Sequence, residues 1–600
     1  MLSALSEHFS DGLDAHLNGT LIHADNFQAL NLLQARYREQ VKCIYIDPPY
    51  NTNATEIIYK NGYKQSSWLC LMESRLKASY SLQAIDGIIS VAIDDYEASK
   101  LIELLSSVYG EENQLGIVAV RINPKGRMTK RKFSLVHEYA IFYGKTGNAK
   151  IKKLPENPED KTHNYKRDSD GSWYLPVNLR KQGVDSEAER ADGSLLDRYY
   201  PIYYDPETKK ISVTEKLPVE IFPVDNSGQK RIWRRGKDAI NAMFQSGDIW
   251  ANETSNGYQV YFKFRGGLDG KLMQSIWSDA KYSASDYGTK ILDNTIGQRE
   301  LFSYPKSPHT VTDSIRAISD ETHGLILDYF AGSGTTAHAV INLNREDGGR
   351  RRYILVEQGE YFDTVLKPRV QKVIYSENWK DGKPVPSEKQ ADKDGQYTPY
   401  KGVSQIVKVL KLESYEDTLN NLALHNPNRD LFGHLPESAQ SDYVLRYMLD
   451  VESRASLLNV SDFAKPFDYE MDIATDSAGA GVRRKVDLVE TFNYLLGLTV
   501  LAVEDRRFDK GYVMVTGWLP QHSGDDKTLI VWRDRERWPQ AEDLLDRLRI
   551  NPQNTEFAAV YLNGDHTLTT AWTNENGESG RLKIRQTEAA FLDLMFAEVR

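Results

Sequence analysis

The sequence predicts an α/β protein built on a parallel sheet, with one unit inserted into it and a small α/β domain after it. Short apolar, β-rich runs alternate with helical patterns over residues 1–145 and again over residues 324–357. The alternation stops between about residues 146 and 290. With 600 residues, the chain is too long for a single hydrophobic core, so several domains are expected.

Residues 1–145 are predicted to form the first half of the sheet. A helix is predicted from Ser67 to about Leu82, where Trp68, Met72 and Leu76 recur at helical spacing. Because helical patterns separate the strands, we expect a parallel arrangement. The predicted strands are residues 43–46, 88–93, 116–120 and 139–144.

Residues 146–290 are polar and rich in Tyr, Gly and Asp, with short runs such as YYPIYY and YQVYFKF. They predict an inserted domain of mixed structure. The α/β pattern then returns in residues 291–385 and stops in a polar linker at 386–402. We expect residues 402–600 to fold separately, and we find no internal repeat.

Within the C-terminal region, residues 486–498 predict an amphipathic helix, and YVMVTG, TLIVWRD and FAAVYLNG predict strands. The apolar stripe of the helix is typical of a domain core, and a partner surface is the alternative. The region contains no second glycine loop and no His and Cys cluster with metal spacing. We therefore expect a role in assembly, and a chain cut near Tyr397 is expected to keep cofactor binding.

A glycine loop follows the predicted strand that ends in LILDY. Gly332 and Gly334 lie in a tight turn before a helical pattern, where the backbone can approach a nucleotide-like ligand closely. Glu357 ends the next predicted strand, where a carboxylate can accept hydrogen bonds from ribose hydroxyls. The lysine of a P-loop is missing, so an adenosine-containing cofactor is favoured, and a structural turn is the alternative.

The second motif is IDPPYN, which follows the strand at residues 43–46. Two prolines end the strand and remove two N–H groups, so the carbonyl of Pro48 is expected to point outward without a local partner. Together with the Asp47 carboxylate it can accept both hydrogens of an exocyclic amine, while Tyr50 can stack on a heterocycle. Methyl transfer to such an amine depends on holding donor and acceptor in line and requires no metal.

With DPPY ahead of the glycine loop and a long insertion between them, the sequence resembles the β class of amino-methylating DNA methyltransferases. Within that class it looks like the Mod subunits of type III restriction-modification systems, through LIHADNFQALNLL, SSWLCLMESRL, VAIDDYE and LFSYPKSPHTV. The resemblance implies a Rossmann-like methyltransferase fold with permuted motif order, S-adenosylmethionine as cofactor, and an inserted target-recognition domain. The DPPY form is more similar to adenine-N6 enzymes than to cytosine-N4 enzymes.

The resemblance also implies roles for individual residues. The catalytic motif is Asp47, Pro48, Pro49 and Tyr50. The methionine part of the cofactor would be lined by Asp328, Phe330, Gly332, Ser333 and Gly334. Ribose would be held by Glu357, the adenine amine by Asp25, and the cofactor side by Lys306. Asp94 and Asp95 are expected to shape the pocket at a polar strand end.

Charge is unevenly distributed along this acidic chain, whose net charge is −10. A basic run is predicted to contact DNA phosphates through Arg121, Lys125, Arg127, Lys130, Arg131 and Lys132. A second cluster, from Lys230 to Lys237, includes Arg234 and Arg235. Solvated surface is the alternative for both clusters.

The leading hypothesis is an adenine-N6 methyltransferase acting on a flipped base of double-stranded DNA in a restriction-modification or phage-defence system. We expect a cytoplasmic protein, because no apolar segment could span a membrane and the start does not resemble a signal peptide. The resemblance to Mod subunits implies a homodimer that works with a nuclease or helicase subunit. The two cysteines, Cys43 and Cys70, are expected to be free thiols. Methylation of cytosine N4 or RNA adenine, and an inactive recognition subunit, remain the alternatives.

Overall fold

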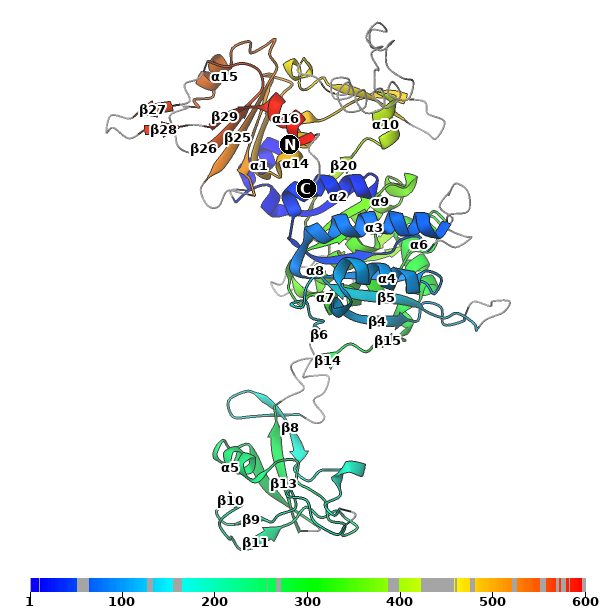
Figure 1. Ribbon diagram of the computed structural model, residues 1–600, viewed down its shortest axis with the longest axis vertical. Coiled ribbons are helices and arrows are strands. Elements are labelled where there is room, and N and C mark those ends of the chain that lie inside the picture. Colours follow the sequence, from blue (N-terminus) through cyan, green and yellow to red (C-terminus); the bar gives the residue numbers. More distant parts are fainter. Residues whose placement is uncertain are drawn as a thin grey trace, which may run out of the picture. The chain divides into compact units, whose positions relative to one another are not determined.

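The computed structural model forms two compact units (Figure 1). One comprises Met1–Lys152 with Gln274–Arg600, and the other comprises Lys153–Met273. The structure describes residues 2–9, 11–50, 64–126, 133–154, 165–190, 192–255, 257–265, 271–386, 399–421, 458, 461–474, 481–520, 526–550, 557–567, 571–573, 579–581 and 583–595.

The larger unit is built on a nine-stranded sheet with the order β15-β4-β5-β3-β2-β16-β17-β1-β20. Neighbouring strands from β3 to β20 are parallel. The strands are β1 (Leu17–His23), β2 (Val41–Ile46), β3 (Gln83–Ile93), β4 (Gln114–Val120), β5 (Glu138–Gly144), β15 (Ile276–Trp277), β16 (His323–Asp328), β17 (Arg350–Glu357) and β20 (Ile406–Lys411).

All four strands predicted in the first 145 residues are present, but one of them, β5, is not parallel to the rest. β5 is antiparallel to both β3 and β4. A parallel pair needs a long crossover, usually a helix. Helix α4 makes such a crossover from β3 to β4, whereas β4 and β5 pair antiparallel on either side of residues 121–137.

Helices cover both faces of the sheet (Figure 1). One layer is α2 (Asn26–Tyr37), α3 (Lys64–Leu82) and α4 (Ala98–Tyr109), and the other is α7 (Pro308–Ile318), α8 (Thr335–Asp347) and α9 (Leu366–Tyr375). On the predicted helix α3, Trp68, Met72 and Leu76 are fully buried at spacings of four residues. Each such side chain contributes about 1.5–3 kcal/mol of burial free energy, which fixes α3 against the sheet.

The unit Lys153–Met273 has a hydrophobic core of its own, around Trp233, Ile240 and Phe262. Its elements include the four-stranded sheet β12-β13-β8-β7 and the three-stranded sheet β10-β9-β11. The strands are β7 (Lys166–Arg167), β8 (Trp173–Asn178), β9 (Ile202–Tyr204), β10 (Ile211–Ser212), β11 (Val219–Ile221), β12 (Ile249–Thr254) and β13 (Gly257–Phe264), with helix α5 (Lys237–Gln245).

The C-terminal region contains the predicted α/β domain. Its five strands are β23 (Thr499–Arg506), β24 (Tyr512–Trp518), β25 (Lys527–Arg533), β26 (Phe557–Leu562) and β29 (Lys583–Gln586), with helices α14 (Leu488–Leu496), α15 (Ala541–Arg547) and α16 (Thr587–Met595). The apolar stripe of α14 lies in the domain core, where Phe492 packs against Trp532. The N-terminal helix α1 (Leu2–His8) packs on β23 of the same domain.

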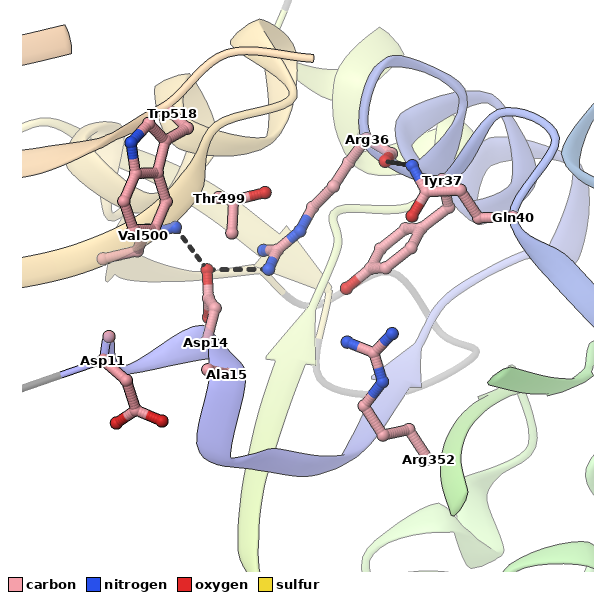
Figure 2. Close-up of a pocket in the computed structure, with 11 residues that line it drawn as sticks. Asp11, Asp14, Ala15, Arg36, Tyr37, Gln40, Arg352, Thr499, Val500 and Trp518 are labelled. Carbon is pink, nitrogen blue, oxygen red and sulfur yellow. Dashed lines mark hydrogen bonds and ion pairs between the residues drawn. The ribbon is translucent and has the colours of Figure 1, made fainter. Parts of the chain in front are cut away.

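The C-terminal domain meets helix α2 and the nine-stranded sheet at a small pocket, drawn in Figure 2. There Asp14 accepts hydrogen bonds from Val500 N of β23 and lies 2.7 Å from Arg36 Nη2 of α2. The side chains of Asp14 and Arg36 are only 2% and 5% exposed. The chain beyond residue 402 is also joined to the sheet directly, because β20 pairs with β1.

Across the residues that the structure describes, every helix is too short or too polar to cross a membrane.

Candidate active site

Five parallel strands bring the predicted site residues to one edge of the sheet. Asp47 follows β2, Asp94 follows β3, and Asp25 lies two residues beyond the end of β1. Asp328 and Glu357 are the last residues of β16 and β17. β2 and β16 are neighbours, and the helices that follow them, α3 and α8, belong to opposite layers. Such a switch point leaves a crevice at the carboxyl ends of the strands, where α/β proteins bind ligands.

The DPPY motif forms a fixed turn at the end of β2. The carbonyl of Pro49 accepts a hydrogen bond of 2.8 Å from Trp68 Nε1, so the buried helix α3 holds the turn in place. Among the described residues, no donor reaches the carbonyl of Pro48. Asp47 Oδ1 is likewise buried without a hydrogen-bond partner there. Two acceptors are therefore left for an incoming donor, as the sequence predicts.

Two further charged side chains meet the motif. Lys306 Nζ lies 2.5 Å from Glu138 Oε2 and 3.4 Å from Asp47 Oδ1, and it donates a hydrogen bond to the Tyr50 hydroxyl. Tyr50 donates in turn to Glu138 Oε2 at 3.0 Å. Lys306 was expected on the cofactor side, and its contacts are with the catalytic motif.

Burial and neighbouring charge shift the titration of these groups. Burial raises the pKa of Asp47 to about 6, although Lys306 acts in the opposite direction. Burial would lower the pKa of Lys306, but the charges of Asp47 and Glu138 raise it above its ordinary value. Burial also raises the pKa of Asp94 to about 6. Near neutral pH, the Asp47 carboxylate is thus an acceptor that can also take up a proton.

The glycine loop after β16 has the tight geometry that the sequence predicts. Gly332 and Gly334 have φ values of +53° and +80°, in the region that favours glycine. A Cβ on Gly332 would lie 3.2 Å from the ring of Phe302. The loop is held by Glu357, whose carboxylate accepts hydrogen bonds from Gly332 N at 2.7 Å and Gly359 N at 2.8 Å.

Asp328 is buried at the start of this loop. Its carboxylate accepts hydrogen bonds from Phe330 N at 3.0 Å and from the Thr336 hydroxyl at 2.5 Å. Burial raises the pKa of Asp328 to about 7, in spite of these hydrogen bonds. A cationic ligand at this place would stabilise the ionised form.

Arg369 of α9 donates hydrogen bonds to the residues that follow Gly332 and thereby holds the glycine loop in place. It is fully buried, and its guanidinium donates to Ser333 Oγ at 2.8 Å and to Thr335 Oγ1 at 2.9 Å. It also donates to Nδ1 of His338, whose pKa is lowered well below its ordinary value by burial and by the charge of Arg369. No sequence motif marks Arg369 as part of the site.

Asp25, which follows β1, caps helix α2. Its Oδ1 caps helix α2 by accepting a hydrogen bond from Phe27 N at 2.9 Å, and its Oδ2 lies 3.0 Å from Arg75 Nη2. Capping of this kind stabilises a helix by about 1 kcal/mol. Contact of Asp25 with the cofactor's adenine stays a prediction.

The predicted phosphate-binding clusters are only partly described. Arg127, Lys130, Arg131 and Lys132 lie outside the described residues, whereas Arg121 and Lys125 are exposed beyond the end of β4. In the second cluster, Arg231 Nε is tied to Asp225 Oδ2 at 2.8 Å. Arg234 donates to the carbonyl of Asn178 and is half-buried, and Arg235 is exposed.

Sequence reasoning missed Glu138, whose side chain is only 3% exposed. A carboxylate at the start of the apolar run EYAIFYG was a signal that could have marked it, because acidic residues are rarely buried without a partner. Across the described part of the chain, no group of three or more His, Cys, Asp or Glu side chains could hold a metal ion.

Comparison with known proteins agrees with this geometry. The family model N6_N4_Mtase, described as DNA methylase, matches residues 41–367. The type II methyltransferase M.KpnI of Klebsiella pneumoniae is 32% identical over 344 residues, which cover 56% of this chain and 79% of that protein. The type III restriction-modification enzyme EcoPI Mod subunit of Escherichia phage P1 is 30% identical over 382 residues, which cover 57% of each chain. A probable Mod subunit of Haemophilus influenzae, HindVI, is 23% identical over 535 residues, which cover 79% of this chain and 66% of that protein.

Proposed function

Because the chain belongs to the N6_N4_Mtase family of DNA methylases, we propose that it methylates N6 of an adenine flipped out of double-stranded DNA. The observation that supports this most strongly is the pair of motifs on neighbouring strands. β2 presents the Asp47 carboxylate, whose Oδ1 accepts no hydrogen bond from the described residues, and β16 presents the glycine loop at the same edge of the Rossmann-like sheet. An amine acceptor site and a nucleotide-type loop are thus adjacent.

The residues at this edge fit S-adenosylmethionine. Gly332 leaves room that a Cβ would fill, and the carboxylates of Asp328 and Glu357 suit a cationic amino-acid moiety and ribose hydroxyls. When bound, this cofactor supplies an electrophilic methyl group on a sulfonium, which is a good leaving group. In the proposed site the protein positions the amine through Asp47 and the Pro48 carbonyl, while Tyr50 supplies a ring for stacking.

Target recognition is assigned to the inserted unit Lys153–Met273. One face of its four-stranded sheet carries aromatic rings, with Trp250 stacked on Tyr261 and Tyr174 against the edge of Trp250. The cross-strand pairing puts the amides of Asn178 and Gln259 on this face, 3.0 Å apart. Amide side chains can pair with adenine edges, and aromatic rings can pack against nucleotides. Phosphate contact is assigned to the exposed cations, among them Arg121 and Arg235.

The wider context is also a proposal. The Mod subunits named above belong to type III restriction-modification enzymes. By this likeness the chain marks a cell's own DNA within a defence system against phage, acts as a homodimer in the cytoplasm and works with a nuclease or helicase subunit. The C-terminal domain would serve assembly.

The test is to incubate the full chain with labelled S-adenosylmethionine and assorted duplex DNA, and then to identify the modified base by mass spectrometry. N6-methyladenine is the expected product. N4-methylcytosine, or transfer to RNA only, would contradict the proposed base or substrate.

Asp47→Ala separates chemistry from binding, because it removes the carboxylate acceptor and leaves the glycine loop intact. Loss of an acceptor that acts mainly in the transition state should lower the transfer rate by about 100-fold or more, with cofactor affinity unchanged within about threefold. Glu103→Gln, on the exposed face of α4, is the matched control and should retain the wild-type rate. If the Asp47 variant kept a rate within about threefold of wild type, the proposed catalytic site would be wrong.

A further inference from the structure

The buried ion pair between Glu138 and Lys306 lies beside the catalytic motif. Their side chains are 3% and 11% exposed, and they come from β5 and from the segment just before α7. Burying two charges costs free energy that their mutual attraction often fails to offset. Burial of this pair therefore does not by itself indicate a stabilising role, and its contacts with the catalytic motif point to a function in the active site.

The ion pair with Glu138 determines which groups the Lys306 ammonium contacts. Lys306 Nζ is 2.5 Å from Glu138 Oε2, but its ion pair with Asp47 Oδ1 is longer, at 3.4 Å, and lacks hydrogen-bond geometry. The same ammonium lies 4.8 Å from the centre of the Tyr50 ring. Glu138 also accepts the hydrogen bond from the Tyr50 hydroxyl. Glu138 thus binds both groups that border Asp47.

Building on the proposed function, we propose that Glu138 is a positioning residue, which holds Lys306 against Tyr50 at ion-pair distance from Asp47 and keeps it from forming a hydrogen bond to Oδ1. Asp47 Oδ1 then stays free to accept a hydrogen bond and afterwards a proton from the target amine. Lys306 supplies a compensating positive charge without occupying the acceptor.

The proton balance of methyl transfer explains why Asp47 Oδ1 has to be free of a hydrogen bond from Lys306. In the transfer, the neutral amine nitrogen would form a bond to the methyl carbon while the carbon–sulfur bond of the sulfonium breaks and its electron pair stays on sulfur. The positive charge would thus pass from sulfur to nitrogen, and a neutral thioether would leave. One N–H bond then breaks, its electron pair returns to nitrogen, and the proton passes to Asp47 Oδ1. The products of this transfer are a neutral methylamine and a neutral carboxylic acid. A Lys306 ammonium hydrogen-bonded to Oδ1 would compete with the amine hydrogen, and afterwards with the transferred proton, for this oxygen.

Glu138 and Lys306 have opposite effects on the pKa of Asp47. Glu138 raises the pKa of Asp47 and Lys306 lowers it, on top of the rise caused by burial. Asp328 faces Asp47 from β16, Tyr45 and Tyr50 lie on its own segment, and Asp94 of the neighbouring strand end interacts with Lys306. Substitution of Glu138 or Lys306 leaves these residues in place and changes the charge that they face, that of Lys306 at Asp94 and that of Glu138 at Tyr50.

The experiment measures single-turnover methylation of duplex DNA between about pH 5 and 9. Glu138→Gln removes a negative charge near Asp47, so the acidic limb of the pH profile should move down by up to about one pH unit. It also releases Lys306 toward Asp47, so the plateau rate should fall about tenfold. Lys306→Met removes a positive charge, so its acidic limb should move up by about one unit. Glu103→Gln should reproduce the wild-type profile.

A purely structural role would not move the two limbs in opposite directions. Since loss of one partner of a buried pair can destabilise the fold, the double variant Glu138→Gln/Lys306→Met is included. With no net change in charge, it should restore the acidic limb to within about half a unit of wild type. Thermal unfolding and S-adenosylmethionine binding, measured on every variant, establish that each is folded.

Unshifted limbs in folded variants, or shifts in the same direction, would overturn the positioning role. If Glu138→Gln fails to fold, Lys306→Met and the double variant still test the opposite signs of the two charges. Failure of the proposed function would look different, because the wild-type chain itself would then methylate neither DNA base at any pH.

Discussion

Replacement of Asp14 by asparagine should loosen the junction between the C-terminal domain and helix α2. The carboxylate lies 2.7 Å from Arg36 Nη2 and 3.7 Å from Lys408 Nζ, and Lys408 is bound to Glu490 at 2.7 Å. Figure 2 shows Asp14 between Arg36 and Val500 N. Without the carboxylate charge, two cations would share a single acidic partner in a nearly solvent-free site.

Breaking a buried ion pair from one side costs about 3–5 kcal/mol. Because each tenfold change corresponds to about 1.4 kcal/mol, exchange of the Val500 amide hydrogen should accelerate by roughly two to three and a half powers of ten. Arg36→Met is the matched variant. It leaves Asp14 beside Lys408, so one cation still compensates the acid, and the acceleration should be smaller.

Hydrogen exchange followed by mass spectrometry on peptides covering β23 is the assay. Peptides from the inserted unit serve as the internal reference, because it forms a separate compact unit. An acceleration of less than tenfold for Asp14→Asn, or a larger effect for Arg36→Met, would refute the reasoning that the Asp14 charge fastens the junction.

Three further predictions concern the site and the inserted unit. Because burial raises the pKa of Asp328 to about 7, the folded chain binds that proton more tightly than the unfolded chain and loses stability as pH rises from about 4 to 7. Asp328→Asn should abolish this loss, so its stability advantage over wild type should grow from near zero at about pH 4 to about 4 kcal/mol at about pH 7, and it should weaken S-adenosylmethionine binding. Parallel pH dependences of unfolding for the two proteins would contradict this prediction. Gly334 has φ +80°, and a Cβ there would lie 3.3 Å from Leu366 Cγ, so Gly334→Ala should cost about 1–2 kcal/mol of stability and lower the cofactor affinity measured by calorimetry. Gly348→Ala, at φ +71° in open space, should lower stability alone. Equal cofactor affinities of the two variants would contradict the assignment of the glycine loop to cofactor binding. Arg234→Ala/Arg235→Ala should flatten the salt dependence of DNA binding by about 0.9 log–log units per lost phosphate contact, and an unchanged slope would make this cluster solvated surface.

The parts of the site that could be predicted are those formed by residues that are consecutive in the sequence. Two prolines after an apolar run must end a strand, and two glycines between a strand and a helical pattern predict a tight loop. Both motifs follow parallel strands, so their place at one sheet edge follows from the fold. Asp47 and Gly332 were found in this way.

The rest depends on contacts between distant segments. Glu138 lies 88 residues after Tyr50 in the chain and 168 before Lys306, and its burial follows from β5 being antiparallel and central beside β3. The sequence does not indicate that reversal, because the apolar run that forms β5 is locally similar to those of the parallel strands. Arg369 is similar: nothing in LKPRV separates a fully buried arginine from an exposed one on the face of a helix.

The relation of the C-terminal region to the catalytic sheet also depends on such contacts. A boundary at residue 402 follows the polar composition, yet β20 adds to the sheet edge beside β1, and Tyr494 of α14 packs in the same core as Tyr37 of α2. Helix α2 begins at the Asp25 cap on the edge that carries the site and ends at Arg36 and Tyr37 on the junction. Because one helix of 12 residues has an end in each place, a displacement of the C-terminal domain has to be absorbed by α2 or by β20. Removal of the chain from about Tyr397 would take away β20 and uncover Tyr37, so the cut disturbs the strand that leads to Asp25 as well as any assembly surface.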